Sequence, residues 1–370
     1  MSAAEIGVLR VDLAAIAHNW RALADHVAPA ECGAVVKADA YGLGIARVLP
    51  ALSAAGCRTF FVATPREAAE ARALHSTARV FVLNGLFPGA ADTILAAGAI
   101  PCLASLAEIE EWSAHARRIG ARLASAIHVD SGLHRLGLPA GEVARLAARP
   151  EWLEPLDVVL IMSHLASADD PNDPASAAQQ QTFERLREML PAAPASLAAS
   201  DGLMLGQPYH FDLVRPGYAL YGGQASGGAR APVVPVVSLY ARVLQVREVG
   251  TRGQVGYSGA WSASRPSRIA TIAAGYADGF ARTASATTDR RGGSVLIHGS
   301  LLPIVGRVSM DLITVDVTDC PILVTRGDIA ELIGPALPLE TVGAEAGTIG
   351  YEVLTRLGRR FERVYAGDGA

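Results

Sequence analysis

Two patterns of hydrophobic and polar positions divide the chain near residue 236. Before that point, from Asp12 to about Gly222, short apolar runs alternate with longer stretches rich in alanine and glutamate. The runs are continuously apolar, which indicates strands buried on both faces, as in a parallel sheet. Eight such runs occur, at residues 34–36, 59–63, 79–83, 100–103, 124–129, 158–162, 195–198 and 210–214.

The stretches between the runs carry helix-end signals. Asp12 is placed to cap a helix over residues 13–27, and Pro65 is placed to open another helix. Residues 106–118 have acidic side chains early and basic ones late, as the helix dipole favours. Repeated units of a buried strand and a helix, eight in number, predict an N-terminal (β/α)8 barrel of the TIM type.

The pattern changes after residue 236. Apolar runs are now separated by glycine, proline and aspartate, with few long helical stretches, which predicts a mainly β C-terminal domain. We therefore expect a barrel domain over residues 12–235 and a β domain over residues 236–370, with residues 1–11 as a candidate addition to the β domain. The runs in question are 238–246, 267–274, 294–298, 304–308 and 312–317.

Composition favours a cytoplasmic protein. The chain has 370 residues and a net charge of −4, with its basic residues scattered, so no basic face for nucleic acid is expected. The N-terminal segment lacks the pattern of a secretory signal, and no run of 18 apolar residues suggests a membrane span. The four cysteines form no CxxC pair and suit a reducing compartment.

Polar residues follow the ends of several predicted strands. Taken singly, a lysine or arginine is most often a solvated surface charge, and a histidine most often completes local hydrogen bonds. Active sites of TIM barrels, however, lie where the strands end, at the C-terminal face, so the group as a whole predicts a site. The group comprises Lys37 after the first run, His128 and Arg135 at or after the fifth, His164 after the sixth, Ser200 after the seventh and Arg215 after the eighth.

Lys37 lies in the segment AVVKADAYGLG, residues 34–44. A lysine at the end of an apolar strand is desolvated, which disfavours its ammonium form and frees the amine for Schiff-base chemistry. Tyr41 lies just beyond, where its phenol can reach a phosphate group. Gly42 and Gly44 lack the third glycine of a dinucleotide-binding fingerprint, which argues against a Rossmann fold.

This segment resembles the cofactor-lysine motif of alanine racemases, and the similarity extends along the whole chain. Seven motifs in the order of that family are a specific signal, whereas each alone is moderately specific. The other six are HVDSGLHRLG (128–137), MSHLASADD (162–170), VRPGYALYG (214–222), AAGYADGFAR (273–282), VGRVSMD (305–311) and GYEVL (350–354).

The resemblance implies an amino-acid racemase that interconverts L-alanine and D-alanine with pyridoxal 5'-phosphate. It implies that Lys37 holds the cofactor and is one catalytic base, and that Tyr276 is the opposite base, contributed across a homodimer with shared sites. No metal is expected, because the sequence shows no metal-ligand spacing. The cofactor-binding residues implied are Lys37, Tyr41, Arg135, His164, Ser200, Arg215, Gly217, Tyr218 and Tyr351, and the substrate-binding residues are Arg135 and Met310.

These roles are chemically coherent. Racemisation removes the α-hydrogen from one face and returns a proton to the other, so two bases must flank the cofactor. The resemblance places Arg215 at the pyridine nitrogen. An arginine remains protonated, so this nitrogen should stay unprotonated, which limits leakage into transamination. Tyr276 has an ordinary pKa near 10 and needs a neighbouring cation or the substrate complex to work near neutral pH.

Three positions depart from the family pattern. His128 stands where many members carry a carbamylated lysine, so a neutral or cationic imidazole replaces an anion, and we expect it to orient Arg135 by a hydrogen bond. Ala199 stands before Ser200 where asparagine is common, which removes one polar contact. Ser309 stands where cysteine is frequent.

Alternatives remain open at this level. A racemase of broader amino-acid specificity would show the same residues. A fold-related decarboxylase is disfavoured because no Gly-rich phosphate loop or Cys-bearing substrate motif of that type occurs. A non-catalytic barrel for pyridoxal-phosphate homeostasis would end near residue 230, whereas this chain continues with GYADG and SMD. His128 and Asp130 alone are too few for a metal site.

Overall fold

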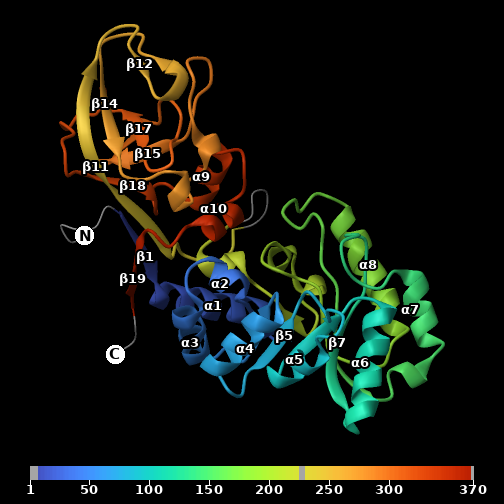
Figure 1. The fold of residues 1–370 in the computed structure, drawn as a ribbon. Coiled ribbons are helices and arrows are strands. Elements are labelled where there is room, and N and C mark those ends of the chain that lie inside the picture. The colour runs from blue at the N-terminus through green and yellow to red at the C-terminus, as the bar shows by residue number, and fades with distance from the viewer. Residues whose placement is uncertain (1–6, 225–229, 368–370) are drawn as a thin grey trace. The chain divides into compact units, whose positions relative to one another are not determined.

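A computed structural model describes residues 7–224 and 230–367 of the chain. The chain divides into two compact units, Ile16–Val234 on the one hand and Met1–Ala15 with Pro235–Ala370 on the other. Figure 1 shows the first unit as strands surrounded by helices and the second as mainly strands. In the described part of the chain, no helix is long and apolar enough to cross a membrane.

The first unit is a barrel of parallel strands. Seven of them pair in sequence order, and β10 (Leu213–Val214) pairs in parallel with β2 (Glu31–Cys32), which precedes β3 with only Gly33 between them. Ala199, just after β9, forms an isolated parallel bridge with Arg215, just after β10. This bridge connects β9 to β10 and closes the barrel. The seven are β3 (Ala34–Val35), β4 (Thr59–Val62), β5 (Arg79–Val82), β6 (Ile100–Leu103), β7 (Leu123–His128), β8 (Leu156–Met162) and β9 (Ala195–Ser196).

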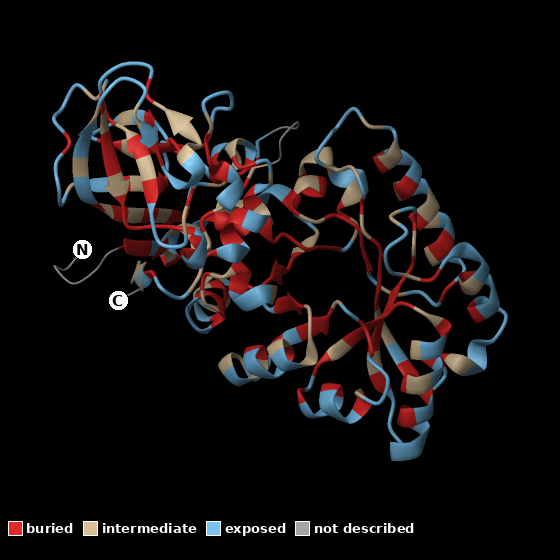
Figure 2. Cartoon of the chain, turned by 45° about the horizontal axis from the view of Figure 1, so that its top comes forward, coloured by how far each residue is buried: buried red, intermediate tan, exposed pale blue. Residues whose placement is uncertain are grey.

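The predicted barrel is therefore confirmed, and each predicted run contains one strand. Burial explains why the runs are continuously apolar. All four residues of β4 are buried, and its Phe60, Phe61 and Val62 are 0% exposed. Neighbouring strands cover the edges of each strand, and helices cover its outer face. Side chains on both faces are therefore shielded from water. Figure 2 shows the barrel strands largely buried, with exposed residues on the surrounding helices.

The barrel helices begin where the sequence signals indicate. The Asp12 carboxylate accepts a hydrogen bond from Ala15 N at 2.9 Å, and Thr64 caps the helix that Pro65 opens. After β9 and β10 the chain forms short 3-10 turns instead, η2 (Asp201–Leu205), η3 (Gln207–Tyr209) and η4 (Tyr218–Tyr221). The helices are α1 (Leu13–Val27), α3 (Ile45–Ala55), α4 (Pro65–Leu74), α5 (Ala91–Ala96), α6 (Leu106–Ile119), α7 (Ala140–Ala147) and α8 (Ala175–Glu188), with the 3-10 turn η1 (Pro150–Trp152) between α7 and β8.

The second unit is built on one large, mostly antiparallel sheet. Its path is β16-β15-β18-β11-β1-β19, with β14 paired to both β11 and β17. Strand β1 pairs with β11 and β19, so the N-terminal strand lies within the sheet of the second unit. The strands are β1 (Gly7–Asp12), β11 (Val237–Val249), β14 (Ser267–Ile272), β15 (Ser294–Ile297), β16 (Ser300–Pro303), β17 (Ile313–Asp316), β18 (Ile329–Ile333) and β19 (Glu362–Ala366).

Smaller elements complete this unit. They are the hairpin β12 (Gln254–Val255) and β13 (Trp261–Ser262), the helices α9 (Leu339–Glu345) and α10 (Gly350–Arg356), and the 3-10 turns η5 (Tyr257–Gly259), η6 (Tyr276–Asp278) and η7 (Arg282–Ala284).

A mainly β second domain is confirmed, but one predicted run is wrong. Residues 304–308 form no strand of their own, because Ile304 pairs only in an isolated bridge with Val315. Gly306 then turns the chain at a φ of +72°, in the left-handed region that interrupts a strand.

Candidate active site

Lys37 begins a left-handed turn that follows β3 after one residue, Val36. The turn is α2 (Lys37–Tyr41), in which Ala38, Asp39, Ala40 and Tyr41 have φ values from +52° to +56°. Each non-glycine residue in this conformation costs about 1–2 kcal/mol, so the surrounding structure has to hold the turn. Sequence reasoning did not foresee this conformation, because none of the four residues is glycine.

Side chains and backbone groups hold the turn at both ends. The Asp39 carboxylate accepts a hydrogen bond from Ile45 N at 2.7 Å, and the Glu67 carboxylate accepts one from Ala38 N at 2.8 Å. Gly42 continues the turn at a φ of +83° and donates to Ala38 O at 2.8 Å.

Burial and nearby positive charge alter the Lys37 amine. Burial lowers the pKa of Lys37, and the cationic Arg135 and Arg215 lower it further, while the carboxylate of Glu67 raises it. A lysine with a lowered pKa carries more of its neutral amine near pH 7, the form that acts as nucleophile or base.

Arg215 is the most fully enclosed charged side chain near Lys37, with an exposure of 2%. Its guanidinium donates to the Ser196 hydroxyl and to Ser163 O at 2.7 Å, and it lies over the ring of Phe61. Burial lowers the pKa of Arg215 to about 10, which leaves it cationic at neutral pH. These contacts hold the guanidinium in one orientation.

His164 and His128 are neutral at pH 7. Burial, together with the charge of Arg215, lowers the pKa of His164 to about 3 and that of His128 to about 4. The Arg215 Nη2 lies 3.5 Å from His164 Nδ1, which can accept its hydrogen bond in the neutral ring.

The environment of His128 differs from our expectation. In the described part of the chain, His128 Nδ1 is buried without a hydrogen-bond partner. Arg135 lies exposed in the loop after β7, and the structure shows no hydrogen bond between it and His128. The expected tether of Arg135 by His128 is therefore absent from this structure.

A cradle of polar groups lies at the ends of β9 and β10. The Ser200 hydroxyl accepts hydrogen bonds from Gly217 N at 3.0 Å and Ala219 N at 3.1 Å. A side chain at Gly217 would place its Cβ 2.3 Å from the Tyr41 hydroxyl, so only glycine allows this approach. Burial raises the pKa of Tyr41, which keeps its phenol protonated. Two backbone N–H groups that point toward one oxygen acceptor are also the kind of donors that bind an anion such as phosphate.

The next residue, Tyr218, is buried at 2% exposure. Ala199, which precedes Ser200, contributes only a methyl group at this position. Within the barrel, the structure thus gathers Lys37 and Arg215 with the histidines and, at the strand ends, the Ser200 cradle.

In the second unit, Tyr276 and Met310 lie side by side. Tyr276 N donates to Ser309 O at 3.0 Å, and Ala277 N donates to Met310 O at 2.9 Å. A Cβ at Gly275 would lie 2.3 Å from Met310 O, which explains the glycine of the GYADG motif. Both predicted site residues are accessible, with exposures of 38% for Tyr276 and 54% for Met310. Tyr351 lies in α10 and is half-buried.

A charged network that sequence reasoning missed supports this turn. Asp278 is 1% exposed, and its Oδ2 accepts a hydrogen bond from Gly275 N at 2.8 Å. Its Oδ1 lies 3.2 Å from Arg360 Nε, and Arg360 Nη1 lies 2.7 Å from Asp311 Oδ1. Both aspartates belong to quoted motifs, but Arg360 belongs to none, so no local signal pointed to the network.

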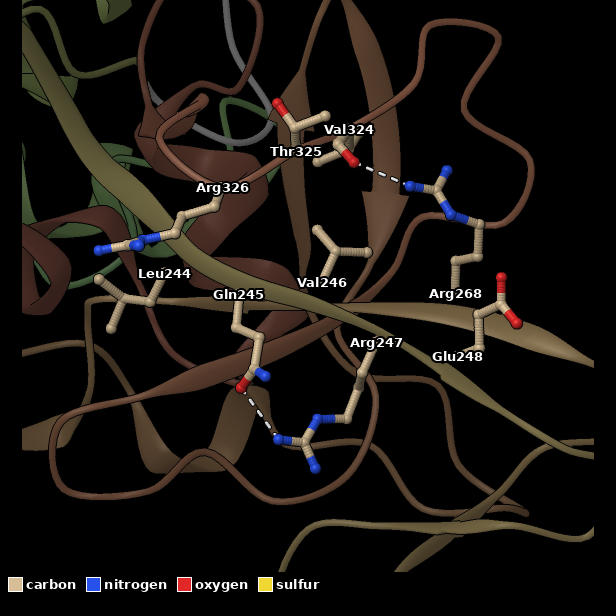
Figure 3. Close-up of a pocket in the computed structure, with 9 residues that line it drawn as sticks. All are labelled: Leu244, Gln245, Val246, Arg247, Glu248, Arg268, Val324, Thr325 and Arg326. Atoms are coloured by element: carbon tan, nitrogen blue, oxygen red, sulfur yellow. Dashed lines mark hydrogen bonds between the residues drawn. The ribbon is translucent and has the colours of Figure 1, made fainter.

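A groove elsewhere in the second unit is lined by none of the predicted site residues. It encloses about 370 Å³ and includes Arg247, Arg268 and Arg326 (Figure 3). Arg268 donates to Val324 O at 2.8 Å, and Arg247 donates to Gln245 Oε1 at 2.9 Å. Two of the three arginine side chains in the groove are therefore already held by hydrogen bonds to other residues that line it.

The chain matches two family models, "Alanine racemase, N-terminal domain" over residues 11–225 and "Alanine racemase, C-terminal domain" over residues 236–365. It is 49% identical to the alanine racemase of Methylobacterium nodulans, over 96% of this chain and 95% of that protein. It is 48% identical to the alanine racemase of Acidiphilium cryptum, over 96% of this chain and 98% of that protein.

A solved structure agrees with these relatives. Alanine racemase from Bartonella henselae, a crystal structure with covalently bound pyridoxal phosphate, superimposes with a TM-score of 0.93 at 42% identity. The match covers 97% of this chain and 99% of that chain. The resemblance drawn from the seven motifs is confirmed, and this chain belongs to the alanine racemase family.

Proposed function

We propose that this chain interconverts L-alanine and D-alanine with pyridoxal 5'-phosphate held covalently by Lys37. The observation that carries the proposal is the half-buried Lys37 amine, with its lowered pKa, close to the buried cation Arg215. The covalently bound cofactor of the Bartonella relative supports the same assignment. Residues 12–235 would form the cofactor-binding domain, and residues 236–370 would form the domain that carries Tyr276.

The residues of the barrel fit this cofactor. Ser200 and the backbone N–H groups of Gly217 and Tyr218 would hold the phosphate, which would replace the Ser200 hydroxyl as the acceptor for Gly217 N. Tyr351 would complete the set. His164 would contact the ring, and Arg215 would face the pyridine nitrogen.

When bound, the cofactor withdraws electrons from the amino acid and so acidifies its α-hydrogen. Lys37 Nζ would take or return the proton on one face, and the Tyr276 hydroxyl on the other. Arg215 would remain protonated, because even its lowered pKa of about 10 lies well above neutral pH. Arg135 would bind the substrate carboxylate, and the backbone of Met310 would also contact the substrate.

We also propose a homodimer with shared active sites. The exposure of Tyr276 and Met310 supports it, because both lie at the surface of the second unit. Mixing Lys37→Ala and Tyr276→Phe chains, each inactive alone, should restore activity through hybrid dimers. No recovery after demonstrated subunit exchange would contradict shared sites. The cytoplasm is the proposed location, which the four free cysteines suit.

The deciding experiment is incubation of the purified protein and pyridoxal phosphate with each L-amino acid, followed by chiral chromatography. Conversion of L-alanine well above all others supports an alanine enzyme, while comparable conversion of larger amino acids indicates the broader-specificity alternative. Cofactor binding without conversion of any amino acid would indicate a binding protein. Lys37→Ala is the control for conversion that does not depend on this site.

A further inference from the structure

We propose that Glu67 is a positioning residue for Lys37: its carboxylate joins the left-handed turn after Lys37 to the start of α4 and places a negative charge near the lysine. The inference rests on the proposed role of Lys37. Glu67 contacts the backbone of the turn, so it acts on the site through Lys37.

The carboxylate of Glu67 serves two chain segments at once. Its Oε2 accepts hydrogen bonds from Ala63 N at 2.7 Å and Thr64 N at 3.2 Å, at the end of β4. Its Oε1 accepts from Ala38 N at 2.8 Å, across a separation of 29 residues in sequence. One carboxylate thus links the ends of two neighbouring barrel strands.

A helix cap alone does not require this arrangement. In a capping box, the N-cap hydroxyl accepts from the backbone of the third helical residue, whose side chain accepts from the N-cap backbone. Thr64 and Glu67 make both of these bonds, with Glu67 N donating to the Thr64 hydroxyl at 3.3 Å. The bond to Ala38 N is additional, and it acts on the segment that carries Lys37.

The turn has a particular need for this partner. Its own backbone bonds run from Ala40 N to Val36 O at 2.9 Å and from Gly42 N to Ala38 O at 2.8 Å. The N–H of Ala38, the first residue in the left-handed region, is satisfied by Glu67. Because four successive non-glycine residues are strained here, loss of this bond should let the turn open.

Charge gives Glu67 a second effect. The charged and titratable groups that act on Lys37 include the cations Arg135 and Arg215, which disfavour its ammonium form, and the neutral His164 nearby. Glu67 opposes the two arginines, so it raises the pKa of Lys37. Removal of the Glu67 charge should therefore lower the pKa of Lys37 and increase its neutral fraction at a given pH.

The sequence makes the test unusually direct, because Lys37 is the only lysine in the chain. Amine reagents can therefore modify only Lys37 and the N-terminal amine. A lysine-specific endopeptidase can cleave only the Lys37–Ala38 bond, which lies inside the turn that Glu67 is proposed to hold.

Three variants separate the effects. Glu67→Gln removes the charge and leaves one acceptor oxygen, which can serve Ala38 N or the N–H groups of Ala63 and Thr64 but not both sets. Glu67→Asp retains the charge but withdraws the carboxylate by one methylene from the turn. Thr64→Val is the matched control, since it removes the hydroxyl that caps α4 and leaves the Glu67 carboxylate in place.

The measurements use the full-length chain freed of cofactor by hydroxylamine, with folding checked by circular dichroism. Acetic anhydride labelling of Lys37 across pH, read by mass spectrometry, should show a pKa lowered in Glu67→Gln and a labelling rate raised roughly threefold below that pKa. Cleavage by the lysine-specific endopeptidase should accelerate in Glu67→Asp. Thr64→Val should match the wild type in both assays.

Unchanged labelling in Glu67→Gln together with unchanged cleavage in Glu67→Asp would overturn the proposal. Changes of equal size in Thr64→Val would also overturn it, because they would assign the effect to the helix cap. These assays need no racemase activity. A failure of the proposed function would instead appear as wild-type protein that racemises no amino acid, whatever Glu67 does.

Discussion

The turn that carries Lys37 and the turn that carries Tyr276 hold their side chains by different means. Lys37 begins a left-handed turn without glycine, and its environment is buried and positively charged. Tyr276 begins a 3-10 turn bounded by Gly275 and Gly279, and it is 38% exposed. Burial and charge alter the chemistry of Lys37, the proposed base of the barrel, whereas backbone bonds and ion pairs mainly fix the position of Tyr276, the proposed base of the β unit.

The comparison predicts how substitutions near each residue should act. Around Lys37, a substitution changes the protonation of the amine as well as its position, because Arg135, Arg215 and Glu67 all act on its pKa. Around Tyr276, the Asp278 network acts on the backbone of the turn. We therefore expect changes near Tyr276 to affect one direction of proton transfer selectively.

The largest effect is expected for Tyr276→Phe. Loss of a positioned general base typically costs about 10²- to 10⁴-fold. Exchange of the α-hydrogen in deuterated water, followed by proton NMR, should nearly vanish for L-alanine and persist for D-alanine, whose α-hydrogen Lys37 is proposed to remove. Tyr257→Phe is the matched control, because Tyr257 is 70% exposed elsewhere in the same unit. Equal, near wild-type exchange of both enantiomers would exclude Tyr276 as a base.

The second effect concerns Asp278, the buried carboxylate beneath the Tyr276 turn. Asp278→Ala leaves Gly275 N and Arg360 without this partner, so we expect a loss of about 1–3 kcal/mol in the free energy of unfolding. Denaturant titration measures that loss. Exchange of the L-alanine α-hydrogen should fall more than exchange for D-alanine. Equal losses for the two enantiomers would remove the distinction between the two turns.

The third effect is a pH dependence on the barrel side. The pKa of His128 is lowered from 6.5 to about 4 in the folded protein, so the unfolded chain binds a proton more readily. Its contribution to stability is therefore present above pH 6.5, falls as the pH decreases, and is gone below about pH 4. Between pH 7 and pH 5 we expect a loss of about 1–2 kcal/mol from this residue.

Thermal melts of wild type and His128→Asn at both pH values check this expectation. The variant should lose less stability on acidification than the wild type does. His18→Asn serves as the control, because His18 is exposed on α1. A wild type and a His128 variant with the same pH dependence would show that this imidazole is protonated without penalty.

The smallest effect is expected for Asp311→Asn. Asp311 pairs with the same Arg360, but the two side chains are 54% and 44% exposed, so the pair is screened by solvent. We expect a change below about 1 kcal/mol in the free energy of unfolding and little change in α-hydrogen exchange. A loss as large as that of Asp278→Ala would mean that the exposed half of the network carries the turn.

Much of the barrel was predictable because its signals are local. A strand buried on both faces needs a continuous apolar run, and each of the eight runs contains one strand. The second domain was harder, and residues 304–308 show why. An apolar run there resembles a strand, but Gly306 turns the chain, and Ile304 finds only an isolated bridge partner. Residues 1–11 were expected as a candidate addition to the second domain, but the pairing of β1 with β19 was not foreseen, because it joins the two ends of the chain.

The sequence by itself determined the barrel, the β domain, the family and the identity of the candidate bases, because motifs and periodic patterns are properties of neighbouring residues. Only the tertiary structure decided how those bases are held. The left-handed turn after Lys37 runs against local preference and is held in part by Glu67, 29 residues away. The Asp278–Arg360 pair likewise joins distant segments. Contacts between distant residues can outweigh local preferences, and these contacts exist only once the chain is folded.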